Sequence, residues 1–488
     1  MSSCCSSRRP DRGAQITVPS ALPLLPVAVI GGGPVGLAAA AHLLERSIEP
    51  VVFEAGLTVG TAPLDWGHVP MFSPWRYNID RACRTFLERS GWQTPNADDF
   101  PTGNDLVQRY LAPLASLPEM NSRLRLGTTV TGIARANAGK VKDSGRGEQA
   151  FDVRFKDADG KEGRLLARAV IVATGTWRHP NPAGASGLPA MGEEAAADRI
   201  RYGMPDVLAT DRHRYAGKRV LVVGSGHSAI GTLINLMSLT EQVPGTTVSW
   251  AARSADLTRA YGGGDADQLP ERGALGQRLK AMVDSGRIAL LAPFTVSEIQ
   301  QGEHGALLVM DGSGKSVEAD EVVVATGLYP DLGLLREARL DLDPALDCPR
   351  VLAPLIDPNV HSCGSVRPHG AIELQQPDTR LFLAGMVSYG RAPTFLLATG
   401  YEQVRSIAAF IAGDMEAARR VELDLPETGV CSSNRVLAEA GCCGGPVPTD
   451  ADACCVDDAV AKQAGRGGCE CSESVEVSKT PALAEPAE

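Results

Sequence analysis

The chain has 488 residues, of which 44% are hydrophobic, so it is long enough for two or three globular domains that each bury a core. Its formal net charge is −11, from 47 basic and 58 acidic residues, which argues against nucleic acid or an anionic membrane as its main partner. The most apolar run, residues 21–44, is interrupted by prolines and glycines and predicts neither a spanning helix nor a signal peptide. We therefore expect a cytoplasmic protein whose cysteines, 12 in all, are reduced.

The first predicted element is a short apolar strand, residues 27–30, that runs into a glycine-rich turn and then a helix. Glycines at this spacing permit a tight turn and let the backbone approach a pyrophosphate, while the free amides of the helix N-terminus face the phosphates. A second strand ends at Glu54, where a carboxylate can accept hydrogen bonds from a ribose diol. The predicted turn contacts are Gly31, Gly33, Pro34 and Gly36. Together these features predict a dinucleotide-binding unit.

A second dinucleotide signal begins at Val220, where another apolar strand runs into Gly-x-Gly-x-x-Ala. Alanine is an accepted variant at the third position of this pattern. The next strand ends without an acid, and Arg253 stands there instead, which suits the 2′-phosphate of NADP; the alternative is an exposed arginine on a loop. The predicted NADPH contacts are Gly224, Gly226, Ser228 and Arg253.

Both units close with an apolar strand and the tripeptide Ala-Thr-Gly. The two turns, Thr174-Gly175 and Thr326-Gly327, would let the backbone pass close to a nucleotide, and their repetition marks two related folds. A third segment, residues 379–413, predicts a strand, a turn at Gly385 and a helix. We expect this segment to return to the first unit.

The stretch GSGKS, residues 312–316, is similar to a phosphate-binding P-loop, but Val309 occupies the position of the upstream glycine. It lies between two apolar runs with the character of strands. We therefore predict a hairpin turn there and no nucleotide site.

With these motifs, residues 25–415 resemble the two-dinucleotide-binding flavoproteins, whose members are disulfide reductases or flavin-containing monooxygenases. The resemblance implies an α/β fold of two nested Rossmann-like domains that bind FAD and NADPH. The reductases carry a CxxC or CxxxxC redox pair and an A-x-G-D flavin turn, and this sequence has neither. Met386 follows Gly385 as in the monooxygenases, so both residues would contact FAD. The linker before Val220 departs from the monooxygenases, because it lacks their F-x-G-x-x-x-H pattern.

The resemblance also implies domain boundaries. We expect residues 25–210 and 330–415 to form the FAD-binding domain and residues 216–329 to form the NADPH-binding domain. We expect a disordered N-terminus, residues 1–24, and a flexible cysteine-rich tail, residues 427–488, whose Gly, Pro, Asp and Ala content cannot bury a core.

The family further implies which residues lie near the flavin. Val130 matches the position that contacts adenine, and Asn78 lies where related enzymes place an asparagine, with helix capping as its alternative. Cys363 is the cysteine next to the third segment, with a buried inert thiol as its alternative. Arg391 and the amides after Gly390 would face the flavin carbonyl at a helix start. The candidate catalytic residues are therefore Asn78, Cys363 and Arg391.

Three longer stretches, HSCGSVRPHGA, SYGRAPTFLLATGYEQVR and LPETGVCS, look like flavoproteins encoded in bacterial arsenic-resistance operons, which are described as flavin-dependent monooxygenases. That resemblance implies that NADPH reduces the flavin and that oxygen then forms a C4a-peroxyflavin. The substrate would be a soft nucleophile such as a trivalent arsenical, either arsenite or an organoarsenical. Its pentavalent product would bind thiols less avidly, so oxidation would detoxify it.

The tail holds two adjacent cysteine pairs and one Cys-x-Cys. Soft thiolates in such clusters suit a thiophilic metal or metalloid, although the spacings are not those of a zinc finger. The predicted ligands are Cys442, Cys443, Cys454, Cys455, Cys469 and Cys471. The alternative is a low-complexity tail without function.

Two other functions stay open from the sequence. The chain could be an NADPH-dependent reductase that passes electrons from FAD to the tail thiols and on to a disulfide or a bound metal ion. It could also be a metalloid-binding sensor or carrier with a vestigial flavin domain.

Overall fold

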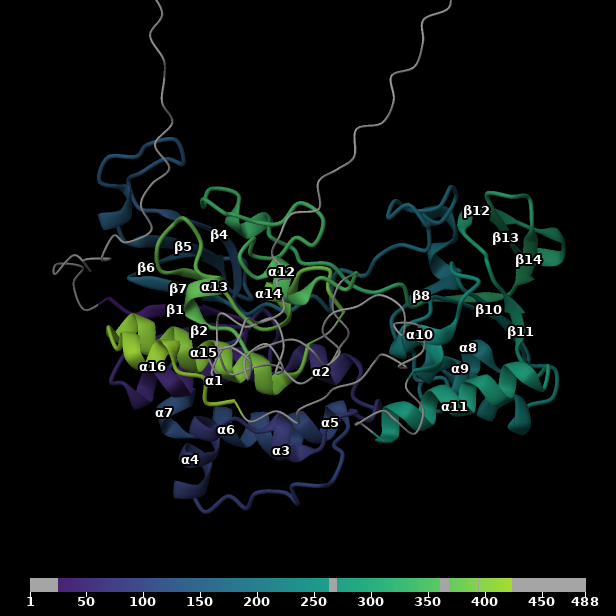
Figure 1. Ribbon diagram of the computed structural model, residues 1–488, viewed down its shortest axis with the longest axis horizontal. Coiled ribbons are helices and arrows are strands. Elements are labelled where there is room, and N and C mark those ends of the chain that lie inside the picture. Colours follow the sequence, from purple (N-terminus) through teal and green to yellow (C-terminus); the bar gives the residue numbers. More distant parts are fainter. Residues whose placement is uncertain (1–24, 263–269, 360–367, 394, 424–488) are drawn as a thin grey trace, which may run out of the picture. The chain divides into compact units, whose positions relative to one another are not determined.

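The computed structural model describes residues 25–262, 270–359, 368–393 and 395–423 of the chain. These residues contain two parallel β-sheets, each covered by helices on one face and by a small antiparallel sheet on the other (Figure 1). The predicted α/β class with Rossmann-like parallel sheets is confirmed.

The first sheet has the strand order β16-β7-β1-β2-β3, and each neighbouring pair is parallel. Its strands are β1 Val27–Ile30, β2 Pro50–Phe53, β3 Leu124–Arg125, β7 Ala169–Val172 and β16 Leu381–Leu383. The edge strand β16 belongs to the third segment of the sequence and pairs with β7. A part of the chain that follows the whole second sheet therefore completes the first one.

Side chains of the central strand β1 alternate between the two faces of this sheet. Val27 and Val29 pack with helices that include α1 (Pro34–Glu45) and α15 (Leu397–Ala412). Ala28 and Ile30 pack with the antiparallel sheet β4-β5-β6. The strands of that sheet are β4 Thr129–Arg135, β5 Phe151–Lys156 and β6 Glu162–Ala167. Because both faces are covered, every residue of β1 is buried, which explains its uninterrupted apolar sequence.

The second sheet has the strand order β11-β10-β9-β15-β8 and is also parallel throughout. Its strands are β8 Ile200–Tyr202, β9 Arg219–Val223, β10 Thr247–Ala251, β11 Ala289–Leu291 and β15 Glu321–Val324. Val220 and Val222 of β9 pack with α9 (His227–Gln242) and α11 (Pro270–Asp284), and Leu221 and Val223 pack with the antiparallel sheet on the other face. That sheet consists of β12 Val296–Gln301, β13 Leu307–Asp311 and β14 Ser316–Ala319.

The stretch similar to a P-loop forms the turn between β13 and β14, which pair antiparallel. The carboxylate of Asp311 accepts hydrogen bonds from the amides of Ser313 and Lys315, both at 2.9 Å, and closes the turn. The predicted hairpin is therefore confirmed.

Short helices connect these layers. Around the first sheet they are α2 Thr61–Asp65, α3 Trp75–Asn78, α4 Arg81–Arg89, α5 Gly103–Leu106, the π-helical turn Val107–Leu111, α6 Ala112–Ser116, α7 Pro118–Asn121, α12 Ala353–Ile356, α13 Ala371–Leu374, α14 Met386–Tyr389 and α16 Met415–Arg419. Near the second sheet they are α8 Arg212–Tyr215 and α10 Thr258–Tyr261. Single 3-10 turns lie at Arg146–Glu148, Glu194–Arg199, Glu303–Gly305 and Gly333–Leu335.

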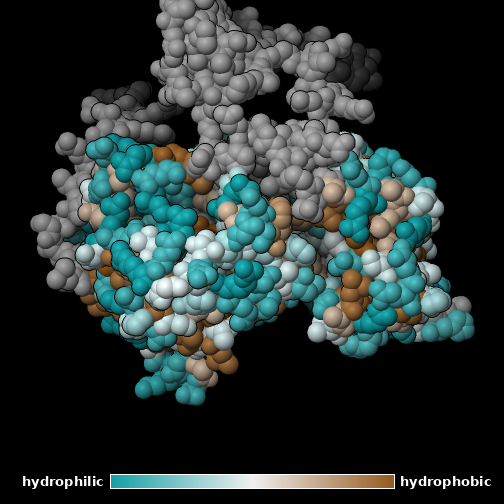
Figure 2. Space-filling view, turned by 90° about the horizontal axis from the view of Figure 1, so that it is seen from below, coloured by the Kyte–Doolittle hydropathy of each residue, from teal (hydrophilic) through white to brown (hydrophobic). Residues whose placement is uncertain are grey.

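The face drawn in Figure 2 is mainly polar. Figure 2 shows hydrophilic residues over most of the coloured surface on the face it draws, with smaller apolar patches between them. Within the described ranges, no helix combines the length and the apolar character that crossing a membrane requires.

Candidate functional site

The first glycine turn lies between β1 and α1. Gly31 has φ +114°, and a Cβ there would lie 2.4 Å from the carbonyl oxygen of Ala173. A Cβ on Gly36 would lie 1.9 Å from the carbonyl oxygen of Gly31. A Cβ on Gly33, in contrast, would meet nothing within 4 Å. The first and third glycines are therefore required by the packing of the chain itself, and the second leaves space in which a ligand can approach the backbone.

The N-terminus of α1 adjoins that space. The helix begins with Pro34, and its first turn has no side-chain cap and no acidic residue. Its free amides and its dipole favour an anion at this end. An open position at Gly33 beside an uncapped 12-residue helix fits the pyrophosphate of a dinucleotide.

Glu54 follows β2 at the edge of this turn. Its carboxylate accepts hydrogen bonds from the amides of Gly32 and Gly56, each at 2.7 Å. These hydrogen bonds tie the end of β2 to the glycine turn. Because the side chain is only half-buried, a ligand can still reach it. Val130, the expected adenine contact, lies in β4 and packs against the apolar cluster that contains Phe53, the residue before Glu54.

The second glycine turn, between β9 and α9, repeats this geometry. Gly224 has φ +129°, and a Cβ there would lie 2.2 Å from the carbonyl oxygen of Ala325, whereas a Cβ on Gly226 would meet nothing within 4 Å. The helix α9 again lacks a side-chain cap, and Ser228 lies in its first turn. Ala229, at the third position, is fully buried. The second turn therefore fits the pyrophosphate of another dinucleotide.

Arg253 is placed differently from the sequence prediction. Phe53 pairs with Ile30 in the first sheet, and Ala251 pairs with Val223 in the second. The residue that corresponds to Glu54 is therefore Ala252, and Arg253 is one position further on. Arg253 is exposed, so a ligand can reach its guanidinium.

The two Ala-Thr-Gly turns lie beside the glycine turns. Gly31 approaches Ala173 and the amide of Thr174, and Gly224 approaches Ala325 and the amide of Thr326. Gly175 and Gly327 have φ of +68° and +96°, a backbone conformation that favours glycine. Each nucleotide-binding rim is thus built from two segments of its own sheet.

The third segment reaches the first glycine turn. Gly385 follows β16 with φ +73°, and a Cβ there would lie 3.1 Å from the side chain of Val35 in the first turn of α1. Met386 begins α14 and is half-buried. The structure thus brings Gly385 to the N-terminal end of the helix that carries the first glycine turn.

Asn78, a candidate catalytic residue, is fully buried at the end of α3. Its amide nitrogen donates to the carbonyl oxygens of Ser73 and Pro74, at 2.6 and 3.1 Å, and its amide oxygen accepts from the Ser73 hydroxyl at 2.9 Å. These contacts give Asn78 a local structural role, but it is not the helix cap expected as the alternative, because α3 has no side-chain cap and Asp80 caps α4. Its role toward a flavin stays a prediction.

Arg391, another candidate, lies in a loop. The expected helix start after Gly390 is wrong, because α15 begins only at Leu397 and the amide of Arg391 donates to the carbonyl oxygen of Leu346 at 2.7 Å. The guanidinium pairs with Asp347 at 2.5 Å and lies 5.3 Å from the centre of the Tyr329 ring. The sequence could not show this, because Asp347 and Tyr329 precede Arg391 by a long stretch of chain.

The remaining candidate cysteines, Cys363 and the six of the tail, lie outside the described residues. In the described ranges the free cysteines are Cys83 and Cys348, both buried. Burial raises the pKa of the Cys348 thiol to about 12, so this thiol is inert near neutral pH. No group of three or more His, Cys, Asp or Glu residues in the described part of the chain could hold a metal ion.

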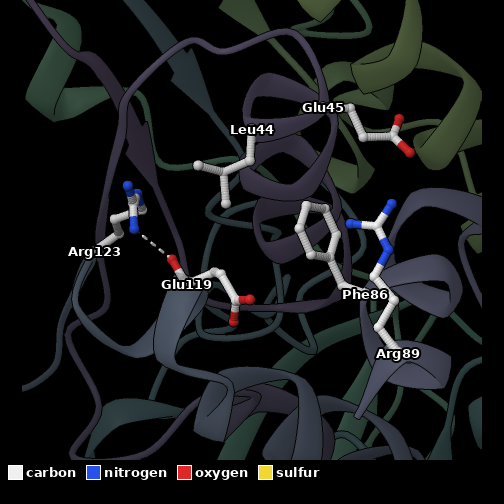
Figure 3. Close-up of a pocket in the computed structure, with 6 residues that line it drawn as sticks. All are labelled: Leu44, Glu45, Phe86, Arg89, Glu119 and Arg123. Carbon is white, nitrogen blue, oxygen red and sulfur yellow. Dashed lines mark hydrogen bonds between the residues drawn. The ribbon is translucent and has the colours of Figure 1, made fainter.

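Two cavities differ in their place relative to these turns. One of about 740 Å³ is lined by Asp65, Thr102, Trp177 and Tyr202 among others, and Trp177 follows the first Ala-Thr-Gly turn. The other, of about 580 Å³, is drawn in Figure 3. It is lined by Leu44, Glu45, Phe86, Arg89, Glu119 and Arg123. Leu44 and Glu45 end α1, so this second cavity lies a helix length away from the glycine turn, roughly 18 Å at the rise of an α-helix.

Comparison with known proteins gives a family. The model of the pyridine nucleotide-disulphide oxidoreductase family matches residues 28–349. Flavin-containing monooxygenase 3 from Macaca mulatta is 29% identical over 226 residues, which cover 44% of this chain and 39% of that protein. Ferredoxin–NADP reductase from Paramagnetospirillum magneticum is 26% identical over 185 residues, which cover 37% of this chain and 47% of that protein. The match thus spans less than half the length of these curated relatives.

Solved structures share the fold. Bacillithiol disulfide reductase from Bacillus cereus superposes with a TM-score of 0.57 at 22% identity, covering 80% of this chain and 99% of that one. An FAD-bound cadaverine monooxygenase of the desferrioxamine pathway, from Erwinia amylovora, superposes with a TM-score of 0.56 at 14% identity, covering 84% of this chain and 99% of that one. At these identities the likeness concerns the fold alone.

Proposed function

The chain belongs to the pyridine nucleotide-disulphide oxidoreductase family, and we propose that it is a monooxygenase that uses FAD and NADPH to oxidise a soft nucleophile. The observation that carries the proposal is the pair of glycine turns. Each turn has one glycine, Gly33 or Gly226, whose missing side chain leaves open space beside an uncapped helix. Two such turns on two sheets are what a flavin and a nicotinamide dinucleotide require.

The residues divide between the two expected cofactors. FAD would be held by the first glycine turn, by Glu54 at its ribose, by Val130 at adenine and by the turns at Thr174-Gly175 and Gly385-Met386. NADPH would be held by Gly224, Gly226 and Ser228, by the turn at Thr326-Gly327 and by Arg253 at the 2′-phosphate. These assignments rest on the geometry of each rim, and nested domains with the boundaries given above are part of the proposal.

A monooxygenase explains the cysteines better than a reductase does. A disulfide reductase needs a pair of cysteines that can exchange electrons with the flavin, and the sequence has no CxxC or CxxxxC. Cys83 and Cys348, the cysteines in the described ranges, are both buried and unpaired. The flavin would therefore pass its electrons to oxygen and not to a neighbouring disulfide.

The role of the protein in this proposal is to bind the two cofactors and to orient them. The flavin, once reduced by NADPH, supplies the oxygen-transfer chemistry. The helix ends of α1 and α9 hold the phosphates, and Glu54 holds a ribose. His227 begins α9, and its ring centre lies 5.0 Å from that of Phe72, so the second glycine turn meets the segment that leads to Asn78. Asn78 and Arg391 remain candidate catalytic residues.

For the substrate we propose a trivalent arsenical, either arsenite or an organoarsenical. Support comes from the clustered tail cysteines Cys442, Cys443, Cys454, Cys455, Cys469 and Cys471, whose thiolates suit a thiophilic metal or metalloid. The tail would capture the arsenical and deliver it to the flavin, and Cys363 would meet it there. A cytoplasmic location, in which these thiols stay reduced, belongs to the same proposal.

The test is to load the purified chain with FAD and supply NADPH, oxygen and arsenite or methylarsenite. We expect one oxidised arsenical for each NADPH consumed, measured by mass spectrometry and by loss of nicotinamide absorbance. Release of hydrogen peroxide without an oxidised arsenical would reject the arsenical as substrate. Faster NADPH consumption with a disulfide under nitrogen would show a reductase instead.

A further inference from the structure

A buried side chain of α15 forms a hydrogen bond with the backbone of the Gly385 turn. The amide of Gly385 donates a hydrogen bond of 2.6 Å to Oε1 of Gln403. Gln403 has no solvent-exposed surface, and it lies in the middle of a 16-residue helix. A glutamine in that position can satisfy a backbone group that β16 and α14 leave without a partner.

The other end of the Gln403 carboxamide fixes its orientation. Since Oε1 accepts from Gly385, Nε2 must donate, and it lies 2.9 Å from Oγ of Ser388 and 2.7 Å from Nε2 of His369. His369 therefore offers an unprotonated Nε2 and is the neutral form with its proton on Nδ1. Ser388 in turn donates to the carbonyl oxygen of Gly385 at 2.7 Å, so both backbone groups of Gly385 are bound by the same network.

The same helix presses the turn against α1. A Cβ on Gly400 would lie 2.7 Å from Cγ2 of Val35, and a Cβ on Gly385 would lie 3.1 Å from it. Gly400 and Gln403 are three positions apart and share one face of α15. Val35 is thus enclosed by the Gly385 turn on one side and by α15 on the other, two residues after the open position at Gly33.

We propose that Gln403 is a positioning residue for the flavin site: its carboxamide, held by His369 and Ser388, fixes the Gly385-Met386 turn against the first turn of α1. The assignment rests on the proposed binding of FAD at these two turns. Gln403 acts through the backbone of Gly385 and touches no ligand itself. It keeps the turn in one conformation before FAD arrives, so less conformational freedom is lost on binding.

The experiment compares Gln403→Leu with Gln376→Leu. Gln376 is also buried, accepts from the amide of Asp341 at 3.0 Å, and lies near the start of β16, whereas Gly385 follows its end. We expect both variants to lose similar thermal stability as apoprotein. Only Gln403→Leu should bind FAD about tenfold more weakly in a fluorescence titration, because the Gly385 amide loses its buried acceptor. At saturating FAD, the visible circular dichroism of the flavin should change in that variant alone.

Gln403→Glu decides the matter if Gln403→Leu does not fold. Ionised glutamate keeps an acceptor for the Gly385 amide but cannot donate to Ser388 or His369, and the protonated form that burial favours keeps one donor in place of two. It should therefore fold, bind FAD severalfold more weakly and again alter the flavin circular dichroism. FAD affinity and flavin spectra equal to those of Gln376→Leu in both variants would overturn the assignment. A wild-type chain that takes up no FAD at all would overturn the proposed function and, with it, this role of Gln403.

Discussion

The two glycine turns of this chain have the same backbone and different supports. Gly31 and Gly224 have φ of +114° and +129°, and each lies against the backbone of its neighbouring Ala-Thr-Gly turn. The first turn is tied to the next strand by the carboxylate of Glu54. The second is tied by the indole of Trp250, which donates to the carbonyl oxygen of Gly224 at 2.6 Å. The two turns therefore share the backbone that the glycines require and differ in the side chain that ties each one to the next strand.

The helices that follow also differ in how they are anchored. The buried residues of α9 are uncharged, from Ala229 to Leu239. The buried face of α1 includes His42, whose Nε2 lies 2.9 Å from the carboxylate of Asp80 at the start of α4. The buried face of α9 is thus held by apolar packing, and the buried face of α1 by apolar packing together with a buried ion pair. The predictions below test what each difference contributes.

The largest effect should come from Gly36→Ala. The new Cβ would lie 1.9 Å from the carbonyl oxygen of Gly31, and backbone must move to relieve the contact. We expect a loss of roughly 3 kcal/mol or more in the free energy of unfolding, together with loss of bound FAD. Urea unfolding of the apoprotein and the flavin content after purification measure these two effects.

The matched variant in the second turn is Ala229→Gly. The chain already has alanine there, so the change removes a buried methyl group and gives the unfolded chain more conformational freedom. We expect the free energy of unfolding to fall by about 1 kcal/mol. FAD content should stay at the wild-type level. Equal losses in the two variants would show that the two turns pack alike and that this part of the comparison is wrong.

The sequence predicted these turns because their requirements are local. Gly31, Gly33 and Gly36 lie within one turn and the helix that follows it, and the apolar run of β1 reflects burial on both faces. The hairpin after Asp311 was predicted for the same reason. Strand register depends instead on how two strands pair, which the sequence does not show. We therefore predicted Arg253 at the position that corresponds to Glu54, whereas the pairing of β9 with β10 puts Ala252 there.

The parts that the sequence missed depend on contacts between distant segments. The helix expected after Gly390 begins later, at Leu397, because the amide of Arg391 donates to the carbonyl oxygen of Leu346 instead. Gln403 looked like any polar residue in a helix, and only the fold brings it to Gly385 and His369. The contact between the backbone of Cys348 and Gly390 is another example, because no motif or spacing in the sequence predicts it.

The second prediction concerns pH and the anchor of α1. Burial alone would lower the pKa of His42, but the carboxylates of Asp80 and, to a lesser extent, Glu45 together outweigh it and raise this pKa to about 9. A group whose pKa is raised on folding stabilises the protein fully below its unfolded pKa of ~6.5 and loses that contribution as pH rises through the folded value. We expect the free energy of unfolding to fall by up to roughly 3 kcal/mol between pH 6.5 and 9.

Asp80→Asn should reduce this slope strongly and lower stability at pH 6.5, because His42 loses its nearer carboxylate partner and keeps only Glu45, while the helix cap on Cys83 can remain. The control is Asp378→Asn. Asp378 pairs with Arg135 and Arg146, and burial lowers the pKa of Arg135 only to about 10. That variant should lose stability by the same amount throughout the window. A wild-type chain with flat stability from pH 6.5 to 9 would contradict the ion pair.

The third prediction concerns the rim of the second turn. Arg253→Ala should weaken the binding of NADPH by ~1.5–3 kcal/mol, the range for a hydrogen bond to a charged group. The binding of NADH should stay nearly unchanged. The ratio of kcat/KM for the two nucleotides measures this directly. Flavin content serves as the internal control, because the first rim has no arginine at this position. Similar use of NADPH and NADH by the unmodified chain would reject Arg253 as the phosphate contact.

The smallest and sharpest effect should come from Gly33→Ala and Gly226→Ala. Both glycines precede their helices with φ of −82° and −83°, which alanine also adopts, and a Cβ at either would meet nothing within 4 Å. Stability of the apoprotein should therefore change by less than ~1 kcal/mol. The new methyl group would instead occupy the space through which a phosphate approaches the backbone. We expect each variant to bind one cofactor about tenfold more weakly, ~1.4 kcal/mol, with FAD affected by Gly33→Ala and NADPH by Gly226→Ala.

Calorimetric titration of each variant with both nucleotides gives the four affinities. If either variant weakened both cofactors, or lost stability without losing affinity, the two open positions would be packing features and not the places where two different dinucleotides meet the chain.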